Sequence, residues 1–147
     1  MPRVRRTADV VWEGNAARGK GTISGRSGGL DALPFSEPAR IGEPEGNTSP
    51  EELLAAAHAG CYAMSLAAEL SRAGTPPERL AVTATCTLDE VEGAGHRVVA
   101  MELEARGSVP GIDADAFGQA ARAADEGCTF SALVKASARV SIDAQLD

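Results

Sequence analysis

Three cysteines are the side chains of this chain best suited to chemistry, and each has a different setting. Cys61 lies in the middle of a predicted helix rich in alanine. Cys128 follows Gly127 at the start of another predicted helix, where backbone N–H groups favour a thiolate. Cys86 alternates with apolar residues in a predicted strand. Because free cysteines are most often small buried hydrophobic residues, we interpret Cys86 as structural.

A metal site and a dithiol motif are two alternatives for these residues. His58 stands three positions before Cys61, a spacing that can bind a metal, and Cys128 and His96 could complete a ligand set. Such sites usually show tighter ligand pairs, so a packed or hydrogen-bonded His58 is favoured. The chain has no Cys-x-x-Cys, which argues against a thioredoxin-type redox motif.

The helix that must position Cys61 is predicted within the stretch from Gly46 to Leu70. Ser49 is a good N-cap, Pro50 suits the first helical position, and Glu52 completes a capping box. The helix is predicted to end near residues 73–74, before two prolines. One face is predicted to hold Leu54, Ala57, Cys61, Met64, Ser65 and Ala68.

The opposite face of this helix is hardly more polar, which predicts a buried helix. It is long enough to suggest a membrane span, but His58, Glu69 and the two opening glutamates argue against one. So much apolar helix needs more cover than one modest sheet provides, and dimerisation would supply it.

The other predicted elements alternate between strands and helices. Strands are predicted at 9–12, 21–24, 80–90, 96–108 and 138–142, and helices at 113–126 and 129–135. A turn at 25–29 is expected to lead into residues 30–33, and 35–47 is expected to be an irregular loop. Inward positions of the two long strands are expected to be Leu80, Val82, Ala84, Cys86 and Leu88, and Val99, Met101, Leu103 and Ala105. This order predicts a single α+β domain over residues 1–147, with antiparallel sheets around a long buried helix.

Composition narrows the class of protein. The 147 residues suit one domain, and the formal net charge of -7 argues against nucleic acid as a partner and for a soluble, cytoplasmic protein. No apolar stretch follows the basic residues 1–6, so no signal peptide is expected. An odd number of widely spaced cysteines does not suggest a secreted disulfide framework.

Three motifs together resemble those of the OsmC/Ohr family, the osmotically inducible and organic hydroperoxide resistance proteins, which are thiol peroxidases. The first is Ser49 to Cys61, SPEELLAAAHAGC; the second is the preceding loop Glu37-Pro38-Ala39-Arg40; the third is Gly127 to Leu133, GCTFSAL. The order and spacing of strands also match from about Trp12 to Ile142. His58 and the extended loop that carries Arg40 resemble the OsmC branch more than the Ohr branch.

The resemblance implies a role for each of four residues. Cys61 would be the peroxidatic cysteine and Cys128 the resolving cysteine, which closes a disulfide on the sulfenic acid. Arg40 would hold the thiolate and the peroxide, and Glu51 would orient that arginine. Thr129 stands where the family usually has proline, which bears on the geometry of resolution.

These residue types suit peroxide chemistry for physical reasons. A thiol with a pKa of ~8.5 is only a few per cent thiolate at neutral pH, and a nearby arginine can lower that pKa. Arginine also stays charged and offers a planar fork of donors to a departing alkoxide. Arg18 and Arg26 lie in glycine-rich turns and could replace Arg40.

The sequence thus predicts a cysteine peroxidase that reduces organic hydroperoxides, and possibly hydrogen peroxide, in oxidative or osmotic stress defence. The resemblance implies an intertwined homodimer with active sites at the subunit interface, a dithiol reductant as partner, and no flavin, haem or metal cofactor. The alternative is a non-catalytic dimeric binding or stress protein that keeps the fold.

Overall fold

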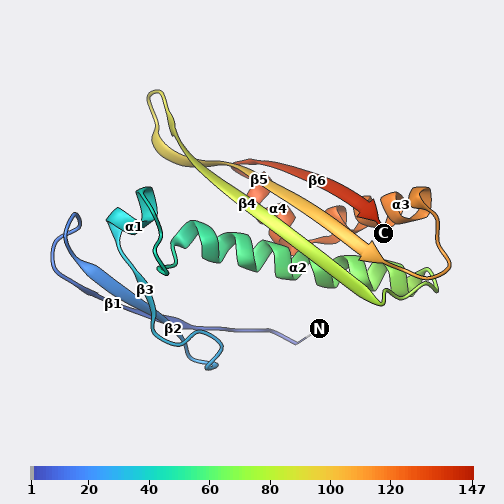
Figure 1. The fold of residues 1–147 in the computed structure, drawn as a ribbon, viewed down its shortest axis with the longest axis horizontal. Coiled ribbons are helices and arrows are strands. Elements are labelled where there is room, and N and C mark those ends of the chain that lie inside the picture. Colours follow the sequence, from blue (N-terminus) through green and yellow to red (C-terminus); the bar gives the residue numbers. More distant parts are fainter. Residues whose placement is uncertain (1) are drawn as a thin grey trace. The chain divides into compact units, whose positions relative to one another are not determined.

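The computed structural model describes residues 2–147, and the chain forms two compact units, Met1–Pro50 and Glu51–Asp147. Figure 1 shows the order of their elements along the chain. Each unit is described by itself below.

The first unit is built on a three-stranded antiparallel sheet in the order β1-β2-β3. Its strands are β1 (Ala8–Glu13), β2 (Lys20–Gly25) and β3 (Leu33–Phe35). The rings of Trp12 and Phe35 lie 5.4 Å apart over β2. Gly21 sits beneath them: a Cβ there would come within 2.5 Å of the Phe35 ring and 2.8 Å of the Trp12 ring. A side chain at position 21 would therefore displace the aromatic pair.

Two details of this unit differ from the sequence prediction. Strand β3 at Leu33–Phe35 was not predicted, and it is held by the N–H of Thr48, which donates to the carbonyl of Pro34 at 2.9 Å. The stretch 35–47 is not wholly irregular, because it holds the short helix α1 (Glu37–Ile41). Ser36 caps this helix by accepting from the Ala39 N–H at 3.2 Å. One and a half turns are too short for helical periodicity to reveal.

The second unit carries a three-stranded sheet in the order β4-β5-β6. Strands β4 (Arg79–Val91) and β5 (Gly95–Ser108) form a long antiparallel hairpin with a register shift between Thr87 and Leu88. Strand β6 (Arg139–Leu146) pairs with β5 in parallel, which corrects the all-antiparallel prediction. The parallel pairing arises because helices α3 (Ala114–Gly127) and α4 (Thr129–Lys135) form a crossover between these strands.

Helix α2 (Pro50–Arg72) begins and ends where the sequence predicts. Its buried residues are His58, Tyr62, Leu66 and Leu70, each four positions after the last. The face predicted to hold Cys61 is therefore not the most buried one: Cys61 lies partly buried at the edge of this row, and Met64 is 71% exposed. Alanines gave the pattern little contrast, and the polar atoms of His58 and Tyr62 disguised the buried row.

Helix α2 is also long and apolar enough to cross a bilayer, by length and composition. The core helix of a soluble protein meets the same criteria, and three of the four buried side chains of α2 belong to the hydrophobic core of this unit. The helix was predicted to be buried on nearly every side, but within a single chain only one side of it is buried.

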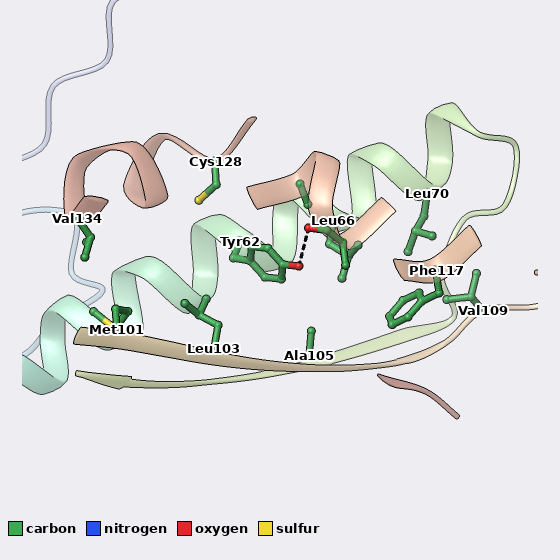
Figure 2. Packing of buried hydrophobic residues seen from close by; sticks show 12 residues of the cluster. Tyr62, Leu66, Leu70, Met101, Leu103, Ala105, Val109, Phe117, Cys128 and Val134 are labelled. Atoms are coloured by element: carbon green, nitrogen blue, oxygen red, sulfur yellow. Dashed lines mark hydrogen bonds between the residues drawn. The ribbon is translucent and has the colours of Figure 1, made fainter. Parts of the chain in front are cut away.

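The core of the second unit lies between α2, the sheet and the crossover helices, as Figure 2 shows. Its buried members are Tyr62, Leu66, Leu70, Met101, Leu103, Ala105, Val109, Phe117, Ala121, Ala124, Cys128 and Val134. The Tyr62 hydroxyl donates to the backbone carbonyl of Ala121 at 3.0 Å, the dashed line of Figure 2, and so ties α2 to α3. The predicted inward positions Met101, Leu103 and Ala105 of β5 are confirmed.

Candidate active site

Two of the three cysteines meet in the second unit. Cys61, on α2, is partly buried, whereas Cys128, between α3 and α4, is only 1% exposed. Both are free thiols, and they lie close enough for each to act on the pKa of the other. Cys86 is also a free thiol, packed from β4 against the same core. Burial, and then the charge of Glu51, raises the pKa of Cys86, which suits a structural thiol.

Cys128 occupies a position that usually belongs to serine, threonine or aspartate. It closes α3, its N–H donating to the carbonyl of Asp125 at 3.3 Å, and it caps α4. The cap is the sulfur itself, which accepts from the N–H of Ser131 at 3.5 Å. The helix-capping geometry therefore fixes where the sulfur points, and Figure 2 shows Cys128 at this turn.

The two thiols have opposite electrostatic settings. Burial acts to raise the pKa of Cys128, but the N–H and hydroxyl of Ser131 and the Cys61 thiol outweigh it, so that this pKa is lowered. Burial raises the pKa of Cys61, and the neighbouring Cys128 adds to the rise. The second unit by itself therefore favours the thiolate on Cys128 rather than on Cys61.

Thr129 explains part of the setting of Cys61. It is the first residue of α4, a position that proline also suits, so the turn after Cys128 is kept. Unlike proline, Thr129 has a backbone N–H, and this group and the N–H of Phe130 favour the Cys61 thiolate. The departure from the family's usual proline thus adds a donor beside Cys61.

His58 is packed and hydrogen-bonded, as predicted. It is fully buried, and its Nε2 lies 2.8 Å from the Ser131 hydroxyl. Burial lowers its pKa, against a smaller opposing effect of Asp125, so the imidazole is neutral at neutral pH. Ser131 is the site residue to which the sequence reasoning gave no role, although its place three residues after a helix-capping Cys128 could have revealed it.

The alternative metal set is not assembled. His96 is exposed at the start of β5, whereas His58 is buried. Across residues 2–147, no group of three or more His, Cys, Asp or Glu side chains is placed to hold a metal ion.

The candidate arginines all lie in the first unit. Arg40, in the last turn of α1, lines a cavity of about 380 Å³, together with Trp12, Ala16, Phe35, Ser36, Glu37 and Pro50. Arg26 is engaged elsewhere, since its guanidinium donates to both carboxylate oxygens of Asp9 at 2.8 and 3.0 Å. The backbone N–H of Arg18 donates to Asn15 within a turn. Of the three, Arg40 is therefore the arginine placed at a cavity.

Glu51, the fourth predicted site residue, belongs to the second unit. It lies partly buried in the first turn of α2, ten residues before Cys61. A carboxylate in this position also stabilises the N-terminus of the helix. Its predicted action on Arg40 stays a prediction.

This fold recurs in solved structures of peroxide-resistance proteins. The organic hydroperoxide resistance protein OhrB of Bacillus subtilis is 23% identical, with a TM-score of 0.73 over 94% of this chain and 97% of that one. An organic hydroperoxide resistance protein of Vibrio cholerae, solved with captopril in one of its active sites, is 22% identical, with a TM-score of 0.75 over 97% and 94%. The fold is thus that of the Ohr and OsmC proteins.

Sequence similarity places the chain more narrowly. The family model described as OsmC-like protein matches residues 42–143. Peroxiredoxin OsmC of Escherichia coli is 39% identical over 143 residues, 97% of either chain. The chain belongs to the OsmC family, as its motifs predict.

Proposed function

We propose that this OsmC family member is a thiol-dependent hydroperoxide reductase that works through Cys61 and Cys128. The observation that carries the proposal is the proximity of these two thiols, each of which acts on the pKa of the other although they come from segments far apart in the sequence. The name peroxiredoxin, carried by a relative that is 39% identical, supports the same reaction class. The two sulfurs have complementary properties: Cys61 is the more accessible, and Cys128 is the better stabilised as a thiolate.

The proposed cycle balances as follows. The Cys61 thiolate attacks the peroxide O–O bond, so that an S–O bond forms and the alkoxide leaves and takes up a proton. The Cys128 thiolate then attacks the sulfur of the Cys61 sulfenic acid, and the departing hydroxide becomes water. A dithiol reductant supplies two electrons and two protons to reopen the disulfide. The lowered pKa of Cys128 suits the second step, because only a thiolate attacks.

The first step needs a cation beside Cys61, because the second unit raises the pKa of that thiol. In our proposal Arg40 supplies this charge at the subunit interface, and Glu51 orients it. The gain in thiolate is at most about thirty-fold, so most of the acceleration comes from positioning the peroxide and stabilising the alkoxide. Trp12 and Phe35 line the Arg40 cavity, which suits an alkyl hydroperoxide whose polar end meets the guanidinium.

The assembly in our proposal is a homodimer of one OsmC-like domain per chain, soluble and cytoplasmic. Exposed apolar side chains in both units, among them Val11 at 59% and Met64 at 71%, support a second copy as their cover. The net charge of -7 argues against nucleic acid. The proposed cycle takes its electrons from the dithiol and needs no bound cofactor.

Thiol counting with three variants tests the cycle. With one equivalent of an organic hydroperoxide, the wild type is expected to lose two thiols and gain no oxygen by mass. Cys61→Ser abolishes turnover, and Cys128→Ala stops at the sulfenic acid and over-oxidises as peroxide rises. Cys86→Ala is the matched control and keeps wild-type turnover. Sulfenic acid on Cys128 in Cys61→Ser, with turnover retained, would reverse the two roles.

Light scattering tests the assembly. We expect twice the 15.0 kDa chain mass at micromolar concentration, with no dissociation on dilution to nanomolar. A folded species with the mass of one chain would refute the dimer, and with it the proposed delivery of Arg40 at a subunit interface.

A further inference from the structure

One buried titratable side chain takes no part in the cycle proposed above. His58 is fully buried in α2, yet it faces the segment that carries Cys128 rather than a purely apolar neighbour. Its Nδ1 is buried and has no hydrogen-bond partner among residues 2–147. A histidine kept in the core with only one ring nitrogen bonded requires a reason, because burying a polar group costs free energy.

The hydrogen-bonded nitrogen of His58 is linked to the proposed resolving cysteine, Cys128, through Ser131. Its Nε2 lies 2.8 Å from the Ser131 hydroxyl, and the Ser131 N–H in turn donates to the Cys128 sulfur at 3.5 Å. The Ser131 side chain also acts on Cys128, because it lowers the pKa of that thiol. Ser131 thus stands between the buried His58 and the buried Cys128 and interacts with both.

The tautomer of His58 decides whether the Ser131 hydroxyl can donate to Cys128. A neutral imidazole donates through one nitrogen and accepts through the other. If Nε2 carries the proton, it donates to the Ser131 oxygen, and the Ser131 hydroxyl is left to donate to the Cys128 thiolate. The unpartnered Nδ1 is then a lone pair rather than an unsatisfied N–H. In the other tautomer Ser131 must donate to His58 and cannot donate to the thiolate.

We propose that His58 is a positioning residue which, through Ser131, aims a hydroxyl proton at Cys128 and holds that sulfur as the thiolate that closes the disulfide. The role in disulfide closure rests on the cycle proposed above, but the thiolate-holding role does not. The charged groups that act on His58 from the crossover helices are Asp125 and Lys135, which are paired with each other. Burial keeps the imidazole neutral, so it orders the serine without taking its proton.

The direct test uses a Cys61→Ser, Cys86→Ser parent whose single thiol is Cys128, titrated by the ultraviolet absorbance of the thiolate. Ser131→Ala is expected to raise the pKa of Cys128 by about one pH unit, because a hydrogen bond to a charged group is lost. His58→Phe is expected to raise the pKa of Cys128 by a smaller amount. His58→Gln, which keeps an amide donor near the position of Nε2, should leave the pKa of Cys128 close to that of the parent. Thr129→Ala removes an exposed hydroxyl from the same turn and is the matched control. An unchanged titration in Ser131→Ala, or an equal shift in the control, would overturn the proposal.

A second readout follows disulfide closure in the otherwise wild-type chain after a single addition of peroxide. At a fixed pH, the thiolate fraction of Cys128 falls up to tenfold when its pKa rises by one unit. A thiolate of higher pKa is also more nucleophilic, which offsets part of this loss. We therefore expect closure in Ser131→Ala to slow about threefold at neutral pH and to recover at alkaline pH. Slower closure that does not recover would indicate a merely structural role. If the proposed cycle is wrong, the wild type forms no Cys61–Cys128 disulfide. The single-thiol titrations still decide whether His58 and Ser131 stabilise the Cys128 thiolate.

A third test uses nitrogen NMR of the wild-type protein, so it does not depend on whether a variant folds. The chain has only two histidines, so the buried His58 can be assigned against the exposed His96. We expect a neutral His58 with its proton on Nε2 at neutral pH. A proton on Nδ1, or a charged imidazole, would overturn the proposal.

Discussion

The two units of this chain differ sharply in how much they bury. In the second unit a cluster of twelve buried apolar residues joins α2, the sheet and the crossover helices. Among residues 2–50, Ile23 and Thr48 are the buried side chains, and every residue of β1 is exposed. Apolar burial dominates folding stability, so the second unit is stabilised from within, whereas the first buries little apolar surface of its own. The unit that offers the cavity arginine is thus the one that single-chain packing supports least.

Loss of packing gives the largest difference expected between the units. Leu66→Ala in the second unit should lower the free energy of unfolding by about 3 kcal/mol, because it empties a fully buried site. Val11→Ala in the first unit removes a side chain that is 59% exposed in one chain and should cost less than about 0.5 kcal/mol at high dilution. Urea unfolding monitored by circular dichroism measures both.

A second copy that covers β1 would change this result in a defined way. The cost of Val11→Ala would then exceed this value at every concentration at which the dimer persists, because the side chain would be buried in the dimer. A cost well above about 0.5 kcal/mol in a species shown to be a monomer would contradict the contrast between the units.

Removal of the cavity arginine comes next in size. Arg40→Ala should lower kcat/KM for an organic hydroperoxide about a hundredfold, about 2.7 kcal/mol, since an oriented donor to the developing alkoxide is lost. Arg26→Ala removes an exposed cation from the same unit, one engaged with Asp9, and should leave kcat/KM unchanged. Equal losses in the two variants would show that general positive charge, rather than the cavity position, matters.

The smallest effect expected is the loss of one buried hydroxyl in the second unit. Tyr62→Phe keeps the ring in the core but loses the hydrogen bond to the Ala121 carbonyl, at a cost of about 1 kcal/mol. Burial raises the pKa of Tyr62, so the phenol remains a donor throughout the neutral range. Thermal unfolding should show a small drop in Tm with unchanged turnover. A large loss of turnover would give Tyr62 a part in the site.

Prediction from sequence worked best where local signals were strong. The Ser-Pro-Glu-Glu start of α2 and the alternation in β4 and β5 placed these elements nearly to the residue, because capping and period-two patterns act locally. The face of α2 was harder, since alanines gave little contrast and the buried row contains a histidine and a tyrosine. The parallel pairing of β6 depends on a long-range crossover that no local pattern encodes.

The candidate site was predictable in part for the same reason. Motif resemblance singled out Cys61 and Cys128, and the structure brings these two together. Ser131 was not predicted as a site residue, because its contacts depend on two distant features. Cys128 caps the helix that carries Ser131, and His58 contacts Ser131 from another helix. Such a contact joins residues 73 positions apart, which spacing alone cannot reveal.

The parallel pairing of β6 with β5 also sets an order of folding. The β4-β5 hairpin joins neighbours in sequence and can form early, while β6 can pair only after the whole crossover has been made. Cys128 lies within that crossover, so it reaches Cys61 only when α3 and α4 dock. In a nascent or partly folded chain the two thiols would therefore be apart. We expect Cys61 in such a chain to oxidise to sulfinic acid, because the disulfide proposed above could not form.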